Sequence, residues 1–446
     1  MSSAIPYRLT AVQAAKQIRA GTLTAEEYAR SILSRIEERD GTVKAWAYLN
    51  PELVIAQAKE LDQVPLENRG PLHGVSVAVK DVIYTKDMPT EHNSVIYANS
   101  VAGVDAGSIM ILRKAGALIV GKTTTPEFAA VTDGPKTCNP HDPKRTPGGS
   151  STGSAAAVAD FQAAIGLGTQ TAGSTIRPGS FNGIYAFKPT WNSITREGQK
   201  IYSLILDTLG LYTRSVEDLE LLADVFALQD DEPPFQQTGG QFELRAAKIG
   251  LMKTMNWSDN VQPATVAAME TAVKLLKAHG AEVEEVELPD DLRELPYWHS
   301  VVLAAEGRSA FLPEYALSKD KLHSMLVGHV ENASKRTHAE HLRAFDSIAA
   351  ARPRVDALLS KYAAVLTPSV PGEAPVGTES TGSPAFNLIW TALHVPVVNV
   401  PGFQGENGMP VGVSFVAPRY EDRKLLAVCK AAGKIFEEEG GWKSQL

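Results

Sequence analysis

Strand-length apolar runs alternate with helix-length segments along most of this chain, and this alternation limits the folds that it can adopt. Residues 75–79 (Val-Ser-Val-Ala-Val) and 117–120 (Ala-Leu-Ile-Val) have the composition of buried strands, and residues 107–114 between them fit a helix. Further strands are predicted at 163–168, 247–252, 281–288, 363–367, 395–400 and 411–416. Further helices are predicted from Thr24 to Gly41, after Pro51, at 154–160, at 266–276 and at 421–438. Strands separated by helices indicate an α/β protein with a parallel or mixed sheet.

The alternation predicts a single domain over residues 1–446. Residues 1–65 are expected to form an N-terminal helical segment, because Thr24 and Glu27 have the spacing of a capping box and apolar residues recur behind them. The polar stretch 228–241 is the best candidate for an exposed excursion. It lies inside the alternation, so we do not interpret it as a domain boundary.

Charge and cysteine content exclude several classes of protein. A net charge of −8 argues against a nucleic-acid partner, since no basic excess is available to neutralise phosphates. The two cysteines, Cys138 and Cys429, form neither a disulfide framework nor a metal-binding spacing. The N-terminus lacks the apolar core of a signal peptide, and no apolar run approaches the ~20 residues that span a bilayer. We therefore expect a cytoplasmic protein with no metal, cofactor or membrane partner, for which a homo-oligomer remains open.

A phosphate-binding loop pattern occurs at residues 116–123 (Gly-Ala-Leu-Ile-Val-Gly-Lys-Thr). In such a loop the four residues after the first glycine turn their backbone N–H groups toward the phosphates. Here those residues are Ala-Leu-Ile-Val, which favour a buried strand. We therefore reject the ATP-site interpretation of Lys122.

Two serine- and glycine-rich segments, 147–157 and 168–183, carry the strongest functional signal. A serine hydroxyl becomes a nucleophile when a neighbouring base takes its proton. Ser151 fits the nucleophile-elbow pattern Gly-x-Ser-x-Gly. The proline-interrupted residues 138–147 before it cannot form the strand that this motif requires. A nucleophile-elbow hydrolase that uses Ser151 is retained as an alternative.

A base for the nucleophile is less obvious, because no histidine lies in a segment with catalytic character. His141 lies among prolines and His394 in an apolar helix. A buried lysine can act as a base, since desolvation disfavours its charged form and lowers its pKa. Lys80 directly follows the apolar run 75–79 and is the candidate, although a strand-end lysine can equally reach solvent.

These segments resemble the amidase signature family of serine hydrolases. The resemblance rests on ordered blocks: 71–81, 121–128, Asn139-Pro140, the two serine segments, 187–190, Thr367-Pro368, Phe386-Asn387, 400–402 and 409–412. It implies a large twisted mixed sheet covered by helices on both faces, with the signature core at residues 70–215. The resemblance is weak over most of residues 239–362.

The resemblance implies a Ser–cis-Ser–Lys triad made of Ser174, Ser150 and Lys80. Ser174 would be the nucleophile, Ser150 a proton relay after a cis peptide bond, and neutral Lys80 the base. The run Thr171-Ala172-Gly173-Ser174 would direct backbone N–H groups at the oxyanion. The implied activity is hydrolysis of an amide C–N bond through an acyl-enzyme.

Substrate choice is less constrained. Gln170 stands where the family usually has aspartate, and Arg177 lies one position later than the usual arginine, so recognition of a substrate carboxylate is in doubt. The residues expected to contact substrate are Thr90, Asn93, Gln170 and Trp390. We expect a small to medium, partly apolar amide, anilide or carbamate. A glutamine-dependent amidotransferase subunit is the alternative.

Overall fold

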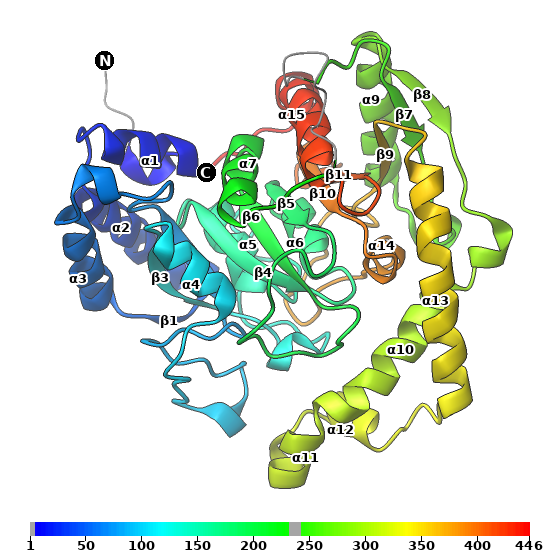
Figure 1. The fold of residues 1–446 in the computed structure, drawn as a ribbon, viewed down its shortest axis with the longest axis horizontal. Helices are drawn as coiled ribbons and strands as arrows, with labels where there is room; N and C mark the ends of the chain where they lie inside the picture. The colour runs from blue at the N-terminus through cyan, green and yellow to red at the C-terminus, as the bar shows by residue number, and fades with distance from the viewer. Residues whose placement is uncertain (1–4, 232–241) are drawn as a thin grey trace.

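Eleven strands form one mixed sheet in the computed structural model, which describes residues 5–231 and 242–446 (Figure 1). Within the described residues, the strand order is β1-β3-β2-β4-β6-β5-β10-β11-β9-β7-β8. The strands are β1 (Trp46–Leu49), β2 (Ser76–Lys80), β3 (Leu118–Thr123), β4 (Ile165–Gln170), β5 (Tyr185–Lys188), β6 (Thr208–Thr213), β7 (Lys248–Leu251), β8 (Glu282–Glu285), β9 (Ala364–Pro368), β10 (Val397–Gln404) and β11 (Pro410–Val416). One sheet thus contains strands from both ends of the chain, which confirms the predicted α/β class.

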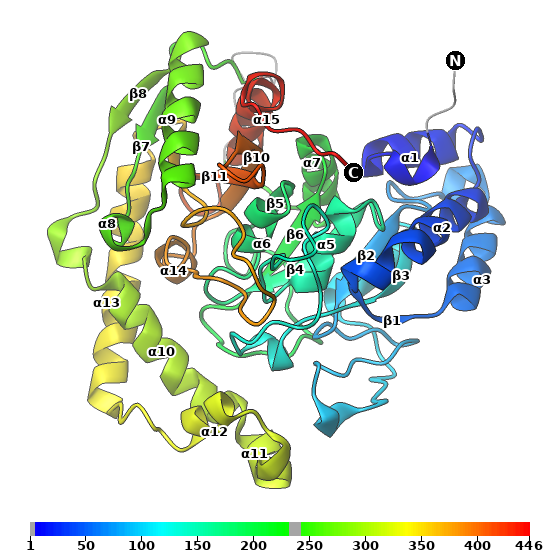
Figure 2. The ribbon, with the colours of Figure 1, turned by 180° about the vertical axis from the view of Figure 1, so that it is seen from behind.

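Helices cover both faces of this sheet, as predicted. They are α1 (Ala11–Arg19), α2 (Ala25–Val43), α3 (Pro51–Asp62), α4 (Gly107–Lys114), α5 (Thr152–Ala159), α6 (Ile176–Phe181), α7 (Val216–Val225), α8 (Trp257–Asn260), α9 (Pro263–Ala278), α10 (Leu295–Ala310), α11 (Leu312–Ser318), α12 (Ser324–Val330), α13 (His338–Leu359), α14 (Leu388–Ala392) and α15 (Asp422–Glu439). Helices α7, α9 and α15 pack against one face, and α5 and α6 pack together against the other (Figures 1 and 2). Each face therefore has its own apolar core.

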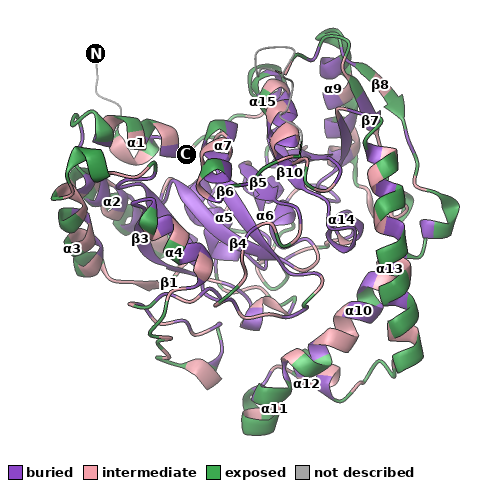
Figure 3. Ribbon diagram, viewed as in Figure 1, coloured by how far each residue is buried: buried purple, intermediate pink, exposed green. Residues whose placement is uncertain are grey.

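Helices α10 to α13 form an arm beside the β7–β9 end of the sheet (Figure 2). Helices α10 and α13 pack against each other, and apolar residues of both join the core that contains α14. Figure 3 shows that the central strands are buried, whereas the arm exposes much of its surface. The arm lies in the region where the family resemblance is weak, and its helices were not predicted.

The start of α2 follows the prediction and its end does not. The Glu27 backbone N–H donates to Thr24 Oγ1 at 3.0 Å, and the Thr24 N–H donates to Glu27 Oε2 at 2.9 Å, so the capping box is confirmed. The predicted stop at Gly41 is wrong, because the helix continues for two residues and buries Val43. Lys44 then ends the helix with a φ of 55°, in the left-handed region.

Strand predictions are confirmed for most of the chain, with shifted ends. The predicted strand 281–288 is shorter, because β8 pairs only with β7 and the last pair joins Glu285 to Leu251, where β7 ends. Strands β1, β5 and β6 were missed. Of the predicted excursion 228–241, residues 232–241 lie outside the described residues, whereas Leu228 is buried and Asp230 accepts hydrogen bonds from the start of α15.

The register of three neighbouring strands places their carboxyl ends at one edge of the sheet. Strand β2 is parallel to both β3 and β4, with Lys80 opposite Thr123 and Val79 opposite Leu167. Ligands of α/β proteins bind at such carboxyl ends. Among the described residues, none of the helices is both long and apolar enough to cross a bilayer.

Candidate functional site

Lys80 ends β2 with its side chain fully buried. Its Nζ lies 2.7 Å from Ser150 Oγ, 3.1 Å from Ser151 Oγ and 2.7 Å from Thr169 Oγ1. A neutral amine has two hydrogens and one lone pair, so three hydroxyl contacts are satisfied when one hydroxyl donates to it. The predicted lysine therefore contacts a predicted serine in the geometry of a base.

The loop before α5 supplies both hydroxyls of segment 147–157 that Lys80 contacts. The peptide bond between Gly149 and Ser150 is cis. Ser151 is fully buried, and its Oγ donates to the Thr169 carbonyl at 3.2 Å and accepts from the Thr169 N–H at 3.1 Å. This close approach needs Gly168, because a Cβ there would lie 2.6 Å from Ser151 Oγ. The hydrogen of Ser151 is thus committed to β4, whereas that of Ser150 is free to point at Lys80.

Ser174 lies in the turn between β4 and α6 and is 9% exposed, against 4% for Ser150 and none for Lys80. Its carbonyl accepts hydrogen bonds from the Ser151 N–H at 3.3 Å and the Tyr212 hydroxyl at 3.1 Å. These bonds fix Ser174 against the loop that carries Ser150. The three residues expected to form the triad therefore come together at one edge of the sheet.

The turn 171–174 has its carbonyl groups occupied. The Thr171 carbonyl lies 2.8 Å from His299 Nε2, the Ala172 carbonyl accepts from Thr391 Oγ1 at 2.8 Å, and the Gly173 carbonyl accepts from the Arg177 N–H at 3.0 Å. No acceptor among the described residues takes the N–H groups of Ala172, Gly173 or Ser174. Because Thr171 and Ala172 are partly exposed, these N–H groups form a donor set of the kind that binds an oxyanion.

Burial sets the electrostatics of Lys80. Desolvation holds the pKa of Lys80 well below its usual value of 10.5, since the ammonium form loses its hydration there. The Asp207 carboxylate acts in the opposite direction and raises this pKa, whereas the Arg177 guanidinium lowers it further. Desolvation is the largest of the three effects, so the neutral form of Lys80 is favoured.

Arg177 points inward from α6 instead of toward a ligand site. It is 4% exposed, and its Nη2 donates to the Gly149 carbonyl at 2.6 Å and to Thr381 Oγ1 at 3.2 Å. Burial lowers the pKa of Arg177 to about 10. Ile176, the residue before it, is fully buried in the apolar core. The arginine therefore supports the Ser150 loop.

Gln170 braces the turn that carries Ser174. Its Oε1 accepts from the N–H groups of Thr175 at 2.9 Å and Ile176 at 3.0 Å, and its Nε2 donates to Thr391 Oγ1 at 3.0 Å. The side chain is fully buried with its polar groups engaged. In this structure Gln170 has no exposed polar group, and its contact with substrate stays a prediction.

The other three residues expected to contact substrate lie in different surroundings. Trp390 has no exposed surface and packs in the core of α10, α13 and α14, so it has no face to offer a ligand. Thr90 is buried, and its Oγ1 accepts from Lys122 Nζ at 2.6 Å. Asn93 is exposed with a φ of 51°. Of the four, only Asn93 has a surface that a ligand could reach.

The strand predicted in place of a phosphate-binding loop before Lys122 is confirmed. Lys122 lies within strand β3, fully buried, and its Nζ pairs with Asp81 Oδ1 at 3.2 Å. The nucleophile-elbow interpretation of Ser151 also lacks its context. Between residues 138 and 150, all of which are described, the chain forms turns and bends with an isolated bridge at Arg145 and no strand.

Sequence reasoning missed Thr169, Asp207, His299 and Thr391. Thr169 could have been found, because it lies in the second serine segment one residue before Gln170. The others come from segments that are distant in sequence, and no motif marks them.

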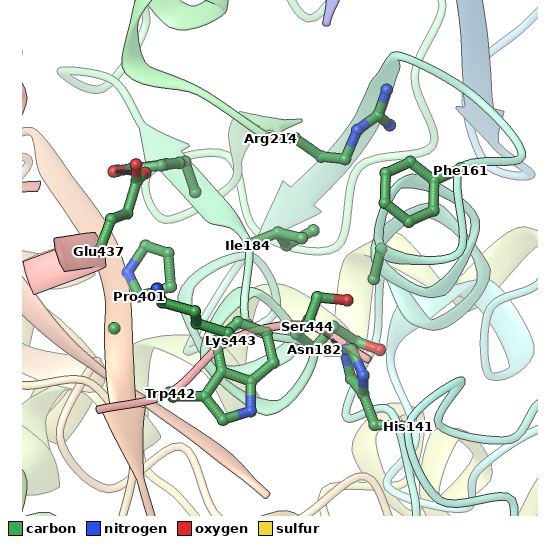
Figure 4. Close-up of a pocket in the computed structure, with 14 residues that line it drawn as sticks. His141, Phe161, Asn182, Ile184, Arg214, Pro401, Glu437, Trp442, Lys443 and Ser444 are labelled. Carbon is green, nitrogen blue, oxygen red and sulfur yellow. Dashed lines mark hydrogen bonds between the residues drawn. The ribbon is translucent and has the colours of Figure 1, made fainter. Parts of the chain in front are cut away.

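A separate cavity of about 260 Å³ lies at the opposite end of α5 (Figure 4). Its lining includes His141, Phe161, Tyr185 and Trp442, and none of the three candidate catalytic residues. Arg214 also lines it, but this guanidinium donates to the carbonyls of Val158, Ala163 and Leu9. The cavity is therefore not part of the site around Ser174.

Comparisons with known proteins found a family model, sequence relatives and solved structures that match most of this chain. A family model described as Amidase matches residues 27–426. One subunit of the glutamyl-tRNA(Gln) amidotransferase of Symbiobacterium thermophilum is 32% identical, over 97% of this chain and 100% of that protein. Among solved structures, the native peptide amidase of Stenotrophomonas maltophilia has a TM-score of 0.80 at 26% identity, covering 99% of each chain. A crystal structure described as amidase has a TM-score of 0.84 at 27% identity, covering 95% of this chain and 99% of that one.

Proposed function

We propose that this chain, which belongs to the Amidase family, hydrolyses the amide C–N bond of a small to medium, partly apolar substrate through an acyl-enzyme on Ser174. The observation that carries the proposal is the 2.7 Å contact between Lys80 Nζ and Ser150 Oγ, in a loop hydrogen-bonded to Ser174. A buried neutral amine, a relay hydroxyl and a more exposed hydroxyl are the parts that covalent acyl transfer needs.

In the first half of the reaction, Ser174 Oγ attacks the carbonyl carbon. Its proton passes to Ser150 Oγ as the Ser150 proton passes to Lys80 Nζ. The oxyanion accepts hydrogen bonds from N–H groups of the 172–174 turn, each worth about 3 kcal/mol in comparable sites. The C–N bond then breaks, and Lys80 returns the proton through Ser150 to the leaving amine.

In the second half, water attacks the ester that joins the acyl group to Ser174. Its proton follows the same route to Lys80, and the proton then returns through Ser150 to Ser174 Oγ as the acid leaves. A carbamate would react in the same way through a carbamoyl-enzyme. No redox or metal step enters this sequence, because water and the three side chains balance every bond and proton.

An aromatic cluster lies beside the site, and its rings are buried, since Phe311 is not exposed and Phe128 and Tyr202 are 1% and 7% exposed. The ring centroids of Tyr202 and Phe311 lie 5.2 Å apart, and those of Phe128 and Phe311 lie 5.8 Å apart. The Tyr202 N–H donates to Asp207, whose carboxylate accepts from the Thr171 hydroxyl. This cluster lies where the arm meets the core of the molecule, two hydrogen bonds away from the oxyanion turn.

A glutamine-dependent amidotransferase subunit is the second candidate, favoured by relatives that are named as subunits of the glutamyl-tRNA(Gln) amidotransferase. A glutamine site needs a cation for the substrate α-carboxylate. Arg177 is committed to the Gly149 carbonyl, and the position two residues after Ser174 is occupied by the apolar Ile176. Both observations favour a substrate without that carboxylate.

The test is a panel of primary amides, anilides, esters, carbamates and glutamine, assayed with wild type and Ser174→Ala. We expect hydrolysis of at least one amide or carbamate that disappears in Ser174→Ala, together with labelling of Ser174 by a fluorophosphonate. Labelling of Ser151 instead would support the elbow hydrolase. Release of ammonia from glutamine alone would support the amidotransferase and contradict the proposal.

A further inference from the structure

Thr171, the first residue of the oxyanion turn, is held from two sides by parts of the chain that are distant in sequence. Its Oγ1 donates to Asp207 Oδ1 at 2.6 Å. Its carbonyl lies 2.8 Å from His299 Nε2. Because a carbonyl oxygen only accepts, His299 carries its proton on Nε2 and donates it. Thr171 is therefore fixed through both its side chain and its backbone.

The two partners are themselves immobilised. Asp207 is 2% exposed, and its Oδ2 accepts from the Tyr202 N–H at 2.7 Å. His299 is 1% exposed and belongs to α10. A second link ties the same helix to the same loop, since the Ser203 hydroxyl, close in sequence to Asp207, donates to Glu306 of α10. The arm and the 202–207 loop thus form one support behind Thr171.

We propose that Asp207 and His299 are positioning residues that aim the oxyanion-turn N–H groups by holding Thr171. This inference rests on the proposed function, because it assigns a task to residues of the same site. A hydrogen-bond donor stabilises an oxyanion only when it already points at the developing charge. Neither residue touches the reacting atoms, so each acts through Thr171.

The carboxylate of Asp207 has a second consequence, for Lys80. It favours the charged form of Lys80 and opposes the effect of Arg177, which faces Lys80 from α6. Burial raises the pKa of Asp207 to about 6, while Arg196 and the Thr171 hydroxyl lower it. On the α10 side, Glu306 acts on Arg196, and burial lowers the pKa of His299 to about 4, which keeps His299 neutral. Removing the Asp207 charge therefore makes Lys80 easier to deprotonate.

The first experiment distinguishes the effect of the Thr171 hydroxyl from the effect of the size of its side chain. Thr171→Val removes the hydroxyl while keeping the shape, and Thr171→Ser keeps the hydroxyl. With a fluorophosphonate as the probe, we expect Thr171→Val to lower the maximal rate of labelling by about 10- to 100-fold with the half-saturating concentration unchanged. Thr171→Ser should stay within about threefold of wild type. Equal labelling by wild type and Thr171→Val would overturn the proposal.

The second experiment removes the negative charge of Asp207. It does not require that the Thr171→Val variant folds. In Asp207→Asn, the acidic limb of the pH–rate profile should shift to lower pH, since Lys80 loses a partner for its charged form. The matched control is Asp422→Asn, because Asp422 is also a buried carboxylate bonded to a threonine, here Thr190, and does not act on Lys80. The control should keep the wild-type limb. An unshifted limb in Asp207→Asn, or an equal shift in the control, would contradict the inference.

A third experiment compares His299→Gln with His299→Leu. The amide of glutamine can still donate a hydrogen bond toward the Thr171 carbonyl, whereas leucine cannot. We expect Gln to retain more of the maximal labelling rate than Leu. Ser174→Ala, tested in parallel, separates this inference from the proposed function. Labelling that persists in Ser174→Ala would contradict the proposed function. Labelling that requires Ser174 but is unchanged by substitutions at residues 171, 207 and 299 would contradict only the positioning role.

Discussion

Arg177 Nη2 donates a hydrogen bond to the carbonyl of Gly149 at 2.6 Å, which joins α6 to the loop that carries Ser150. No carboxylate lies within salt-bridge distance of this guanidinium among the described residues, although it is almost fully buried. A buried cation without an anion raises the energy of other cations nearby. Arg177 therefore holds the Ser150 loop in place and keeps a proton away from Lys80.

Replacement of Arg177 should move the working pH of the enzyme. In Arg177→Gln the cation is gone, so the pKa of Lys80 rises and the acidic limb of the pH–rate profile shifts to higher pH. This shift is opposite in sign to that expected for Asp207→Asn. The measurement is the fluorophosphonate labelling rate across pH, with Arg177→Lys as the charge-preserving control. A limb that moves equally in both variants would show that lost packing, and not charge, is responsible.

Replacement of Lys80 should lower the activity and raise the stability of the fold. Because the pKa of Lys80 is lower in the folded chain than its ordinary value of 10.5, the unfolded chain binds more protons between those values. Stability therefore rises with pH through this window, and at pH 7 the lysine destabilises the fold. We expect Lys80→Met to lose about 10²- to 10⁴-fold in rate and to melt at a higher temperature than wild type at pH 7. Calorimetry at pH 7 and pH 10 checks the sign, since the difference should shrink at the higher pH.

Ser151→Ala should be much milder than the loss of either serine of the proposed triad. Ser151 bridges Lys80 and the backbone of Thr169, so its removal weakens the support of the base. We expect about a tenfold loss of labelling rate, with the label still on Ser174. Ser150→Ala and Ser174→Ala, made on the same background, should lose at least a hundred times more than Ser151→Ala does. Peptide mapping of the label would expose an error if Ser151 were the nucleophile.

Gln170→Leu should destabilise the turn around Ser174. The change leaves the N–H groups of Thr175 and Ile176 without their acceptor, whereas Thr391 Oγ1 loses one donor and still donates to the Ala172 carbonyl. Each unsatisfied buried group costs about 1–3 kcal/mol, so the free energy of unfolding should fall by roughly 2 kcal/mol or more. Gln170→Glu is the comparison variant, because its carboxyl group still accepts from both N–H groups, so its cost comes from the lost donor to Thr391 and from burying a carboxyl group. Denaturant melts that rank the two variants equally would contradict this assignment.

Residues close together in sequence were predictable, and contacts between distant segments were not. The run 75–79 predicted β2, because five apolar-rich residues need a covered strand, but it left open whether Lys80 at its end is buried or reaches solvent. The same logic removed Lys122 from a phosphate loop. The burial of Trp390 and Gln170 was not predictable, because sequence cannot tell a pocket wall from a packed interior. Asp207 and His299 could not be predicted from the sequence, since they matter through tertiary contacts. Asp207, in the 202–207 loop, and His299, in α10, both hydrogen-bond to Thr171.

The hydroxyls of Thr381 and Thr391 complete contacts to Arg177, Gln170 and Ala172 that lie far back in the chain. Strand β10, which follows them, then enters the middle of the sheet between β5 and β11. During translation, the hydroxyls that hold Arg177, Gln170 and Ala172 are therefore synthesised long after Lys80, Ser150 and Ser174. A chain that ends before Thr381 would carry every proposed catalytic residue but lack the hydroxyls that hold Arg177 and the turn before Ser174, as well as strand β10 in the middle of the sheet.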